Sequence, residues 1–278
     1  MDDRLHATLP LDAASAAGSP ERFGYEWQTY AEMRPEYEEQ FRRWTVHLSA
    51  SDWRGKRFLD VGCGMGRNSY WPMTYGAKGG RAIDVDERSL ASARQTLAPF
   101  PEVELRHQSA YAIDGDESFD IVFSIGVIHH LEAPEKALAA MVAATKAGGK
   151  VLIWVYGREN NGLIVGVLTP LRRLFFSKLP IGVVHHLSLY PSLAMWLALR
   201  LGLGSIEYYR LLRRLSLRHL RSIVFDQMLP KIANYWPREK VASMMQSNGL
   251  TDVQLAWVNE MSWSAIGTKP VRAESSAS

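Results

Sequence analysis

The chain has 278 residues, of which 47% are hydrophobic and 22% are charged, and its formal net charge is +3. This balance is typical of a globular protein with a full core, and it excludes a highly charged disordered chain. The single cysteine, Cys63, excludes an intrachain disulfide and a metal site built from several cysteines, so we expect no metal. One free thiol also fits a reducing compartment, and we expect a cytoplasmic protein.

The N-terminal segment starts with acidic residues and has no apolar run long enough for a signal peptide. We expect residues 1–21 to be a disordered leader and residues 270–278 a disordered tail. Residues 22–48 combine recurring aromatic side chains with acids, and helical spacing follows Pro35. Two interpretations are open: this segment packs an aromatic stripe on the core, or its first part, with Tyr25, Trp27 and Tyr30, folds over a ligand as a lid.

The most informative stretch is residues 57–67, RFLDVGCGMGR. A strand-like segment runs directly into Gly62, Gly64 and Gly66. Closely spaced glycines after a strand allow a sharp turn and close approach of the backbone to a ligand, because no Cβ intervenes. A helix beginning there would direct its free N–H groups at the same place.

A second strand ends in AIDVD (residues 82–86), and Asp86 is expected to cap the helix that follows. Asp84 therefore lies at the tip of the second strand, about 20 residues after the glycines. That is the position at which a nucleotide-type cofactor needs a carboxylate for its ribose hydroxyls.

The rest of the chain continues to alternate strands and helices. We expect strands at residues 103–106 and 150–156, a buried strand that turns into a loop over residues 119–131, and an alanine-rich helix at residues 135–146 before the last strand. Strand–helix alternation predicts a mostly parallel sheet covered on both faces. Residues 251–258 and 262–268 then predict an antiparallel hairpin at the sheet edge.

Four motifs in this order resemble the class I S-adenosylmethionine-dependent methyltransferases, and the quinone-biosynthesis C-methyltransferases in particular. They are DVGCGMG (60–66), AIDVD (82–86), ESFDIVFSIGVIHHL (117–131) and AGGKVLI (147–153). The resemblance implies a Rossmann-like α/β fold with a seven-stranded sheet and S-adenosylmethionine as the cofactor. A hydride-transferring Rossmann enzyme is disfavoured, because its loop reads G-x-G-x-x-G whereas this chain has G-x-G-x-G.

The resemblance also implies roles for individual residues. Asp60 and the glycine loop would hold the methionine part of the cofactor, Asp84 would bind the ribose hydroxyls, and Val85 would pack on the adenine. Ser109 stands where the family usually has an aspartate near the adenine amino group. The full set expected to bind the cofactor is Asp60, Gly62, Cys63, Gly64, Gly66, Asp84, Val85, Ser109, Ala110, Ser124 and Tyr30.

Methyl transfer from a sulfonium requires mainly alignment of the nucleophile and exclusion of water. A base helps when the acceptor is an alcohol, a phenol or an acidic carbon. His129 and His130, directly after the fourth strand, are the base candidates by position. Aromatic faces at Tyr25, Trp27 and Tyr30 could stabilise the sulfonium charge.

The acceptor should be determined by an insertion, residues 158–236, which we call the cap; the core then comprises residues 22–157 and 237–269. Residues 160–222 contain nine basic residues and one acid, a net charge of +8, so the rest of the chain sums to −5. The cap is also strongly apolar, although Pro180 and Pro191 interrupt its longest uncharged run. A membrane-spanning helix is therefore disfavoured.

Amphipathic helices over a hydrophobic pocket are expected instead, with membrane-surface contact or homodimerisation through the cap as further options. A solvated arginine face on ordinary helices is the alternative. We expect a lipophilic acceptor with an acidic group, methylated at oxygen or carbon. The residues expected to bind it are Tyr25, Trp27, Tyr156, Arg172, Arg173 and Tyr235, with Asp226 and Trp236 as weaker candidates.

Two other function classes stay open. A nucleic-acid methyltransferase would explain the arginines through phosphate contacts, but the fourth strand ends in SIGVIHH rather than in the Asp/Asn-Pro-Pro-aromatic motif, so no nucleic acid is expected. The second is a regulatory protein that binds S-adenosylmethionine without transferring the methyl group.

Overall fold

The computed structural model describes residues 20–30, 32–162, 164–204 and 206–271, and most of the predicted leader and tail lie outside them. Its centre is a seven-stranded sheet in the order β3-β2-β1-β4-β5-β7-β6. The strands are β1 (Arg57–Val61), β2 (Gly79–Asp84), β3 (Val103–His107), β4 (Phe119–Ile125), β5 (Thr145–Tyr156), β6 (Thr251–Val258) and β7 (Ser262–Thr268).

The first five strands are parallel, and β7 runs antiparallel to both β5 and β6. The predicted Rossmann-like sheet with an antiparallel edge hairpin is thus confirmed. Asn259 and Glu260 link β6 to β7 with positive φ angles of 55° and 57°, the left-handed conformation that a tight hairpin turn demands.

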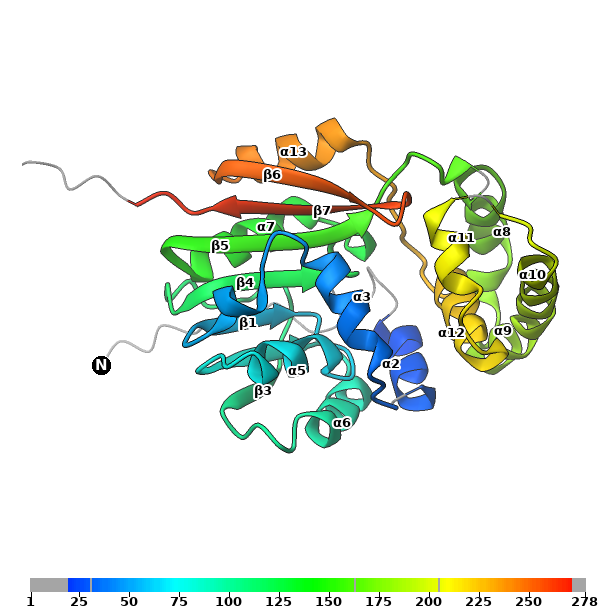
Figure 1. Ribbon diagram of the computed structural model, residues 1–278, viewed down its shortest axis with the longest axis horizontal. Helices are drawn as coiled ribbons and strands as arrows, with labels where there is room; N and C mark the ends of the chain where they lie inside the picture. Colours follow the sequence, from blue (N-terminus) through cyan, green and yellow to red (C-terminus); the bar gives the residue numbers. More distant parts are fainter. Residues whose placement is uncertain (1–19, 31, 163, 205, 272–278) are drawn as a thin grey trace, which may run out of the picture.

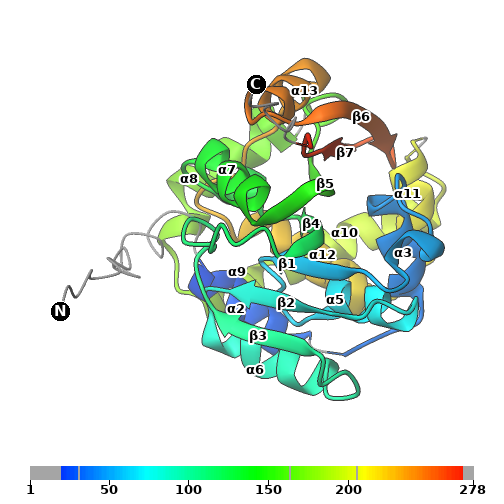
Figure 2. The ribbon, with the colours of Figure 1, turned by 90° about the vertical axis from the view of Figure 1, so that its left-hand side faces the viewer.

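Helices cover both faces of the sheet (Figures 1 and 2). One face packs against helices before and after β1; the other packs against α7 and α13. The core helices are α2 (Pro20–Thr29), α3 (Glu36–Trp44), α4 (Ala50–Trp53), α5 (Arg67–Thr74), α6 (Glu87–Thr96), the short 3₁₀ helix η1 (Ile128–His130), α7 (Pro134–Ala144) and α13 (Arg238–Ser247).

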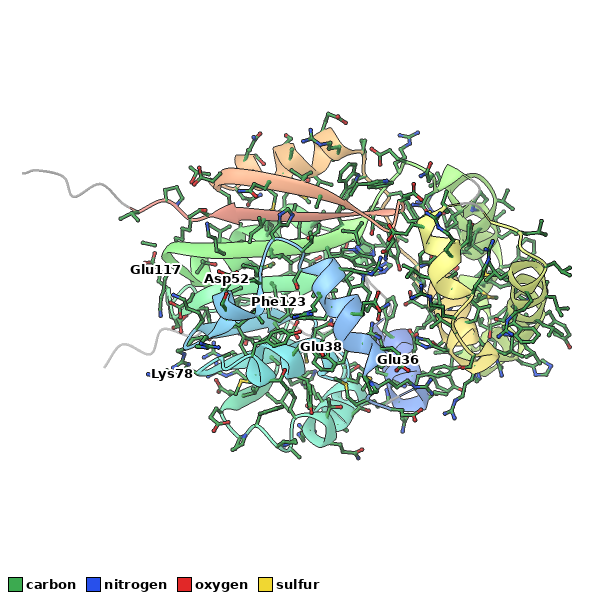
Figure 3. All side chains as sticks on the ribbon, in the orientation of Figure 1. Glu36, Glu38, Asp52, Lys78, Glu117 and Phe123 are labelled. Atoms are coloured by element: carbon green, nitrogen blue, oxygen red, sulfur yellow. The ribbon has the colours of Figure 1, made fainter. Side chains whose placement is uncertain are left out.

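Side-chain alternation along the strands divides the core. Phe58 belongs to the cluster on the α3–α5 face, whereas its neighbour Leu59 belongs to the cluster on the α7–α13 face. Phe123 on β4 lies between the sheet and α3 (Figure 3), with its ring 6.3 Å from that of Phe41. The aromatic stripe of α3 is therefore core packing, as one of the two interpretations held.

Three predicted boundaries were wrong by a few residues. Helix α3 ends at Trp44 rather than at residue 48. Thr145 and Lys146, expected at the end of an alanine-rich helix, belong to β5, because α7 stops at Ala144. At the N-terminus, α2 begins at Pro20, inside the segment expected to be disordered.

The cap leaves the core after β5 and returns before α13. It consists of the π-helix η2 (Ile164–Leu168), α8 (Thr169–Leu174), the 3₁₀ helix η3 (Phe176–Lys178), α9 (Ile181–Leu187), α10 (Leu189–Arg200), α11 (Glu207–Leu212) and α12 (Leu217–Met228). Figure 1 shows these helices grouped beside the sheet. Among the described residues, no helix has the length and apolar character needed to cross a membrane.

The two ends of the cap meet in a neck. Gly157 forms a parallel β-bridge with Trp236. The Trp236 amide donates to the Tyr156 carbonyl and the Arg158 amide donates to the Trp236 carbonyl, each at 3.1 Å. The cap also has hydrophobic clusters of its own, around Val184 and Phe225 and around Leu199 and Leu220.

Candidate active site

A cavity of about 990 Å³ lies where the carboxyl ends of the central strands meet α2, α3 and the cap. Ligands bind at this edge in open α/β sheets, because the loops after the strands converge there. The volume is at the upper end of the roughly 300–1,000 Å³ range of ligand pockets. One continuous space of this size can hold a cofactor together with an acceptor.

The glycine loop forms one wall of the cavity. Gly62, Gly64 and Gly66 have φ angles of 78°, 53° and 82°, which glycine adopts at little cost. A Cβ on Gly62 would lie 2.4 Å from a methyl carbon of Val127, and one on Gly64 would lie 2.9 Å from the indole nitrogen of Trp27. The loop therefore requires glycine for its backbone angles and for space.

Asp84 faces this loop from the end of β2. Its Oδ2 accepts from the Gly64 amide and its Oδ1 accepts from the Asp86 amide, each at 2.9 Å. Burial raises the pKa of Asp84 to about 6, and these backbone hydrogen bonds oppose the increase. Each carboxylate oxygen keeps a second lone pair, so Asp84 can still accept from the hydroxyls of a ligand.

Asp60 lies behind the glycine loop and does not line the cavity. Its Oδ2 accepts from the Ser69 hydroxyl at 2.7 Å, whereas its buried Oδ1 has no hydrogen-bond partner among the described residues. Burial raises the pKa of Asp60 to about 7. Asp60 therefore does not border the cavity, and the structure offers no surface for the direct contact with the cofactor that we predicted.

The other predicted residues divide into two groups. The structure brings the following to the cavity: Gly62, Cys63, Gly64, Asp84, Val85, Ser109, Ala110, Tyr30, Trp27, His130, Tyr156 and Tyr235. It places the following outside the lining: Asp60, Gly66, Ser124, Tyr25, His129, Arg172 and Arg173. The first group is dominated by residues next to strand ends, whose position follows from the sheet.

Each residue of the second group has a structural reason for its position. The Ser124 hydroxyl donates to the Val61 carbonyl at 2.8 Å and so ties β4 to β1. Tyr25 packs edge-on against His185 and Phe225 in the cap. Arg172 is buried and donates to the Gln227 carbonyl at 3.1 Å, while Arg173 is exposed. The two arginines expected to bind the acceptor therefore do not reach the cavity.

The two histidines differ in the same way. His129 is fully buried, its ring 4.0 Å from that of Tyr156, and neither ring nitrogen has a partner among the described residues. His130 lines the cavity, and its Nδ1 donates to the Ile232 carbonyl at 2.8 Å. Burial lowers the pKa of His130 to about 4 and that of His129 well below its usual value. Both are neutral at physiological pH, and His130 is a weak base.

Sequence reasoning missed an arginine that aromatic rings surround. The Arg67 guanidinium lies 5.0 Å from the ring centroids of Trp27 and Tyr37 and 5.3 Å from that of Trp44. These distances are those of cation–π contacts. Arg67 is the first residue of α5, directly after the glycine loop, and it lines the cavity.

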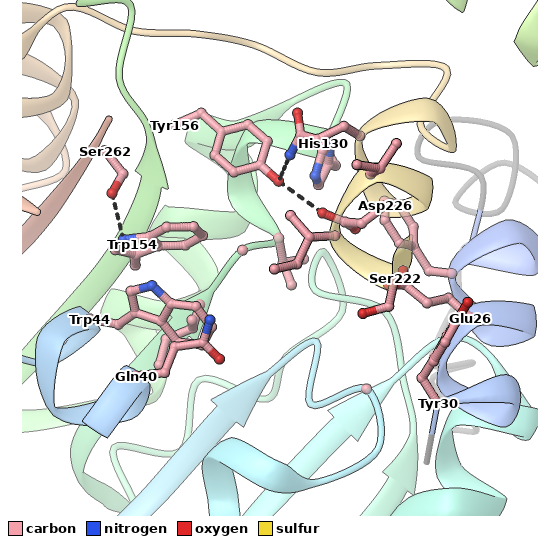
Figure 4. A pocket seen from close by; sticks show the side chains of 18 of the residues that line it. Glu26, Tyr30, Gln40, Trp44, His130, Trp154, Tyr156, Ser222, Asp226 and Ser262 are labelled. Atoms are coloured by element: carbon pink, nitrogen blue, oxygen red, sulfur yellow. Dashed lines mark hydrogen bonds between the residues drawn. The ribbon is translucent and has the colours of Figure 1, made fainter. Parts of the chain in front are cut away.

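Sequence reasoning also missed Glu26, a buried carboxyl group that lines the cavity together with the half-buried Asp226 (Figure 4). The two carboxyl groups interact electrostatically, although Glu26 is on α2 and Asp226 is on α12. The Tyr156 hydroxyl donates to Asp226 Oδ2 at 3.1 Å. Helical spacing gave one signal, because Glu26 shares a face of α2 with Phe23, Trp27 and Tyr30.

The cap supplies the apolar part of the lining. It contributes residues from η2, α8, α10 and α12, namely Ile164, Val167, Leu168, Leu171, Met195, Ile223, Val224 and Met228. The cavity thus joins a polar end at the glycine loop to an apolar end under the cap.

The residues at the polar end fit S-adenosylmethionine. The loop has no Cβ at Gly62 and Gly64, Asp84 keeps lone pairs for two hydroxyls, and Val85 offers an apolar side chain beside it. Within the described part of the chain, no cluster of three His, Cys, Asp or Glu side chains could hold a metal ion.

Comparison with known proteins agrees with this geometry. Residues 59–153 match the family model described as a methyltransferase domain. The chain is 32% identical over 114 residues to a tRNA U34 carboxymethyltransferase of Pseudomonas paraeruginosa, covering 40% of this chain and 35% of that protein. It is 30% identical over 152 residues to a ubiquinone biosynthesis O-methyltransferase of Aromatoleum aromaticum, covering 51% and 62%. The chain thus spans about a third to three fifths of the length of these relatives.

Among solved structures, the fold resembles the 1,6-didemethyltoxoflavin-N1-methyltransferase of Burkholderia thailandensis, with a TM-score of 0.56 and 16% identity. The alignment covers 97% of this chain and 93% of that one.

Proposed function

We propose that this chain transfers a methyl group from S-adenosylmethionine to a small lipophilic acceptor. The match of residues 59–153 to a methyltransferase domain and the order of the strands in the sheet support this proposal. The observation that carries the proposal is the single cavity, which joins the glycine loop and Asp84 to the apolar underside of the cap. O- or C-methylation is the expected reaction. An acidic group on the acceptor stays part of the proposal: Arg172 and Arg173 do not line the cavity, but Arg214 of the cap does.

The roles of the chain's own residues follow from the geometry. The loop at Gly62–Gly64 and the carboxylate of Asp84 would hold the cofactor, which supplies a methyl group already activated on a sulfonium. Arg67 would bind its carboxylate, because the guanidinium adjoins the loop and three aromatic rings hold it in place. Trp27 and Tyr30 would present aromatic faces to the positive charge, a contact worth about 0.5–2 kcal/mol.

Exclusion of water falls to α2 and the cap. Helix α2 packs on α6 of the core and on α12 of the cap, and the Arg22 guanidinium donates to the carbonyls of Phe176 and Leu179 at 2.9 and 2.6 Å. The lid interpretation of this segment is therefore part of the proposal. A closed, apolar site strengthens the electrostatic interactions inside it and aligns the two reactants.

The test is calorimetric titration with S-adenosylmethionine, followed by detection of S-adenosylhomocysteine across a panel of lipophilic acceptors in matched acidic and neutral forms. Saturable binding with turnover of at least one acceptor is the expected result. Binding without turnover across the panel would instead favour the regulatory alternative. Absence of binding would refute the proposal.

Methylation of tRNA is the second candidate, because one relative is named a tRNA U34 carboxymethyltransferase. The exposed basic residues of the cap, such as Arg173, Lys178 and Arg200, could contact phosphates. Binding of unmodified tRNA that weakens steeply between low and high salt would support this candidate. Salt-independent turnover of a lipophilic acceptor would support the first.

A further inference from the structure

The geometry points to the Glu26–Asp226 carboxyl pair as the group that takes the proton from an acceptor bearing a hydroxyl, which makes oxygen the methylated atom. This inference rests on the proposed function and deepens it by naming the acceptor's reactive group. Both carboxyl groups line the cavity, Glu26 from α2 and Asp226 from α12 of the cap.

The pair has hydrogen-bonding capacity to spare. Glu26 is 4% exposed, and its Oε2 has no partner among the described residues. Asp226 is held by a chain of hydrogen bonds: Tyr156 donates to it at 3.1 Å, Gln227 donates to Tyr156 at 2.7 Å, and Tyr235 donates to Gln227 at 3.1 Å. This chain fixes Asp226 and leaves Glu26 Oε2 as the open acceptor (Figure 4).

The pair keeps a negative charge that can accept a proton, because the raised pKa values leave one of the two carboxyl groups protonated. Burial raises the pKa of Glu26 well above its usual value, and the charge of Asp226 adds to this; burial also raises the pKa of Asp226. Two carboxyl groups at one buried site share a proton, because both cannot ionise. The other charged and titratable groups that face the pair are Arg67, Arg172, Tyr156, Tyr208 and Tyr235.

His130 is the rival base in the cavity, and it is weaker. Its pKa of about 4 lies below that of the Glu26 carboxyl, and its Nδ1 is committed to the Ile232 carbonyl. A base is more effective when its pKa is closer to the working pH. His129 has no access to the cavity.

The acceptor's O–H bond breaks and its proton passes to the carboxyl pair. The oxygen–methyl bond forms while the carbon–sulfur bond of the sulfonium donor breaks, and the electron pair of that bond remains on sulfur. The proton later leaves to solvent with the product, which restores the pair.

The experiment uses para-heptylphenol and its methyl ether, para-heptylanisole, as probes that differ only in the hydroxyl proton. Trp27, Trp44 and Trp154 line the cavity, so quenching of tryptophan fluorescence reports binding without turnover. The variants are Glu26→Gln and Asp226→Asn. Glu39→Gln is the matched control, since Glu39 lines the cavity mouth with its side chain 60% exposed.

We expect the wild-type protein and Glu39→Gln to bind the phenol about tenfold or more tightly than the ether, as for a hydrogen bond to a charged group. Glu26→Gln and Asp226→Asn should lose this preference and also remove an infrared band of a protonated carboxyl group. Equal binding of phenol and ether by the wild type, while S-adenosylmethionine still binds, would overturn the inference and leave the proposed function intact. A preference that survives in both variants would overturn it as well.

A separate observation concerns the outer surface of the cap. In the part of the chain that the structure describes, twelve large hydrophobic residues are exposed, and ten of them fall between residues 167 and 203. They are Val167, Leu171, Leu174, Phe175, Val183, Tyr190, Leu193, Leu197, Leu201 and Leu203. Those on α10 recur at the spacing of one helix face, and such a concentration marks an interaction surface.

We infer that this surface docks on an anionic lipid membrane, from which the lipophilic acceptor enters the cavity. Charge complementarity identifies the occupant: residues 160–206 contain no acid, whereas Arg173, Lys178 and Arg200 are exposed among the apolar side chains. Amphipathic helices with basic flanks bind membranes in this way. Val167 and Leu171 are exposed and also line the cavity, so the apolar surface continues into it.

The test is co-sedimentation with phosphatidylglycerol vesicles and with phosphatidylcholine vesicles. We expect binding to the anionic vesicles, at least about tenfold weaker in the double variant Phe175→Ser/Leu197→Ser and unchanged in Val46→Ser, an exposed apolar residue outside the cap. No binding to anionic vesicles would refute the inference. A stable dimer in light scattering that the double variant dissociates would also refute it, since a second copy would then cover the surface.

Discussion

The substitution Asp84→Ala should weaken cofactor binding, whereas two opposing effects should limit the change in the stability of the fold. Asp84 accepts two backbone hydrogen bonds at 2.9 Å, and a buried amide left without its acceptor costs about 1–3 kcal/mol. However, a carboxylate with a pKa of about 6 instead of 3.8 carries about 3 kcal/mol of unfavourable free energy at neutral pH. The variant leaves two amides without an acceptor, which costs about 2–6 kcal/mol, and it removes the unfavourable carboxylate term of about 3 kcal/mol. We therefore expect its free energy of unfolding to change by no more than about 3 kcal/mol.

Cofactor affinity has no such compensation. Loss of a charge-assisted contact to the ribose hydroxyls should weaken binding by about 1–3 kcal/mol, or about 5- to 150-fold. Isothermal titration with S-adenosylhomocysteine measures this, and thermal unfolding of the same samples measures stability. Asp86→Asn is the matched control, because it removes a charge two residues away while asparagine still caps α6. Affinity of Asp84→Ala within twofold of wild type would refute the role that we assign to Asp84.

Three further predictions concern the glycine loop and the two aspartates beside it. Gly62→Ala should destabilise the protein by about 2–5 kcal/mol, from a positive φ of 78° and a Cβ placed 2.4 Å from Val127; urea unfolding checks this, and an unchanged midpoint would contradict the loop geometry. Cofactor affinity should fall as the pH drops below about 6, because Asp84 becomes protonated there, and it should be constant above about pH 7. Titrations at several pH values check this, and Asp84→Asn should abolish the dependence. Asp60→Asn should stabilise the protein most above pH 7, by at most about 4 kcal/mol, which a higher melting temperature would show. The pKa of Asp60 is about 7 in the folded protein and 3.8 in the unfolded chain, so the cost of its buried charge decreases as the pH falls from 7 to 4. Equal stabilisation at pH 5 and pH 8 would argue against this.

The sheet and the cofactor half of the site could be predicted because their signals are local. Strand alternation, the glycines after β1 and the acid after β2 are each encoded within a few residues, and parallel strands bring their carboxyl ends to one edge. For this reason Gly62, Asp84, Val85 and Ser109 all reach the cavity.

The acceptor half could not be predicted in the same way. Glu26 and Asp226 are two hundred residues apart in sequence, and only the packing of α2 against α12 brings them together. The charge of a residue does not tell which way its side chain points. Arg172 was expected to face a ligand, yet its side chain is buried and donates to a backbone carbonyl. His129 follows a strand as a catalytic residue often does, but its ring turns under Tyr156.

The neck of the cap, where Gly157 pairs with Trp236, has an evolutionary consequence. The insertion begins and ends at two adjacent points held by backbone hydrogen bonds, so the strand order does not depend on the length of the insertion. Sequences of different length and composition could be exchanged there with little effect on strand order or on the glycine loop. If the proposed function holds, replacement of the cap would change the choice of acceptor while the glycine loop and Asp84 stay in place.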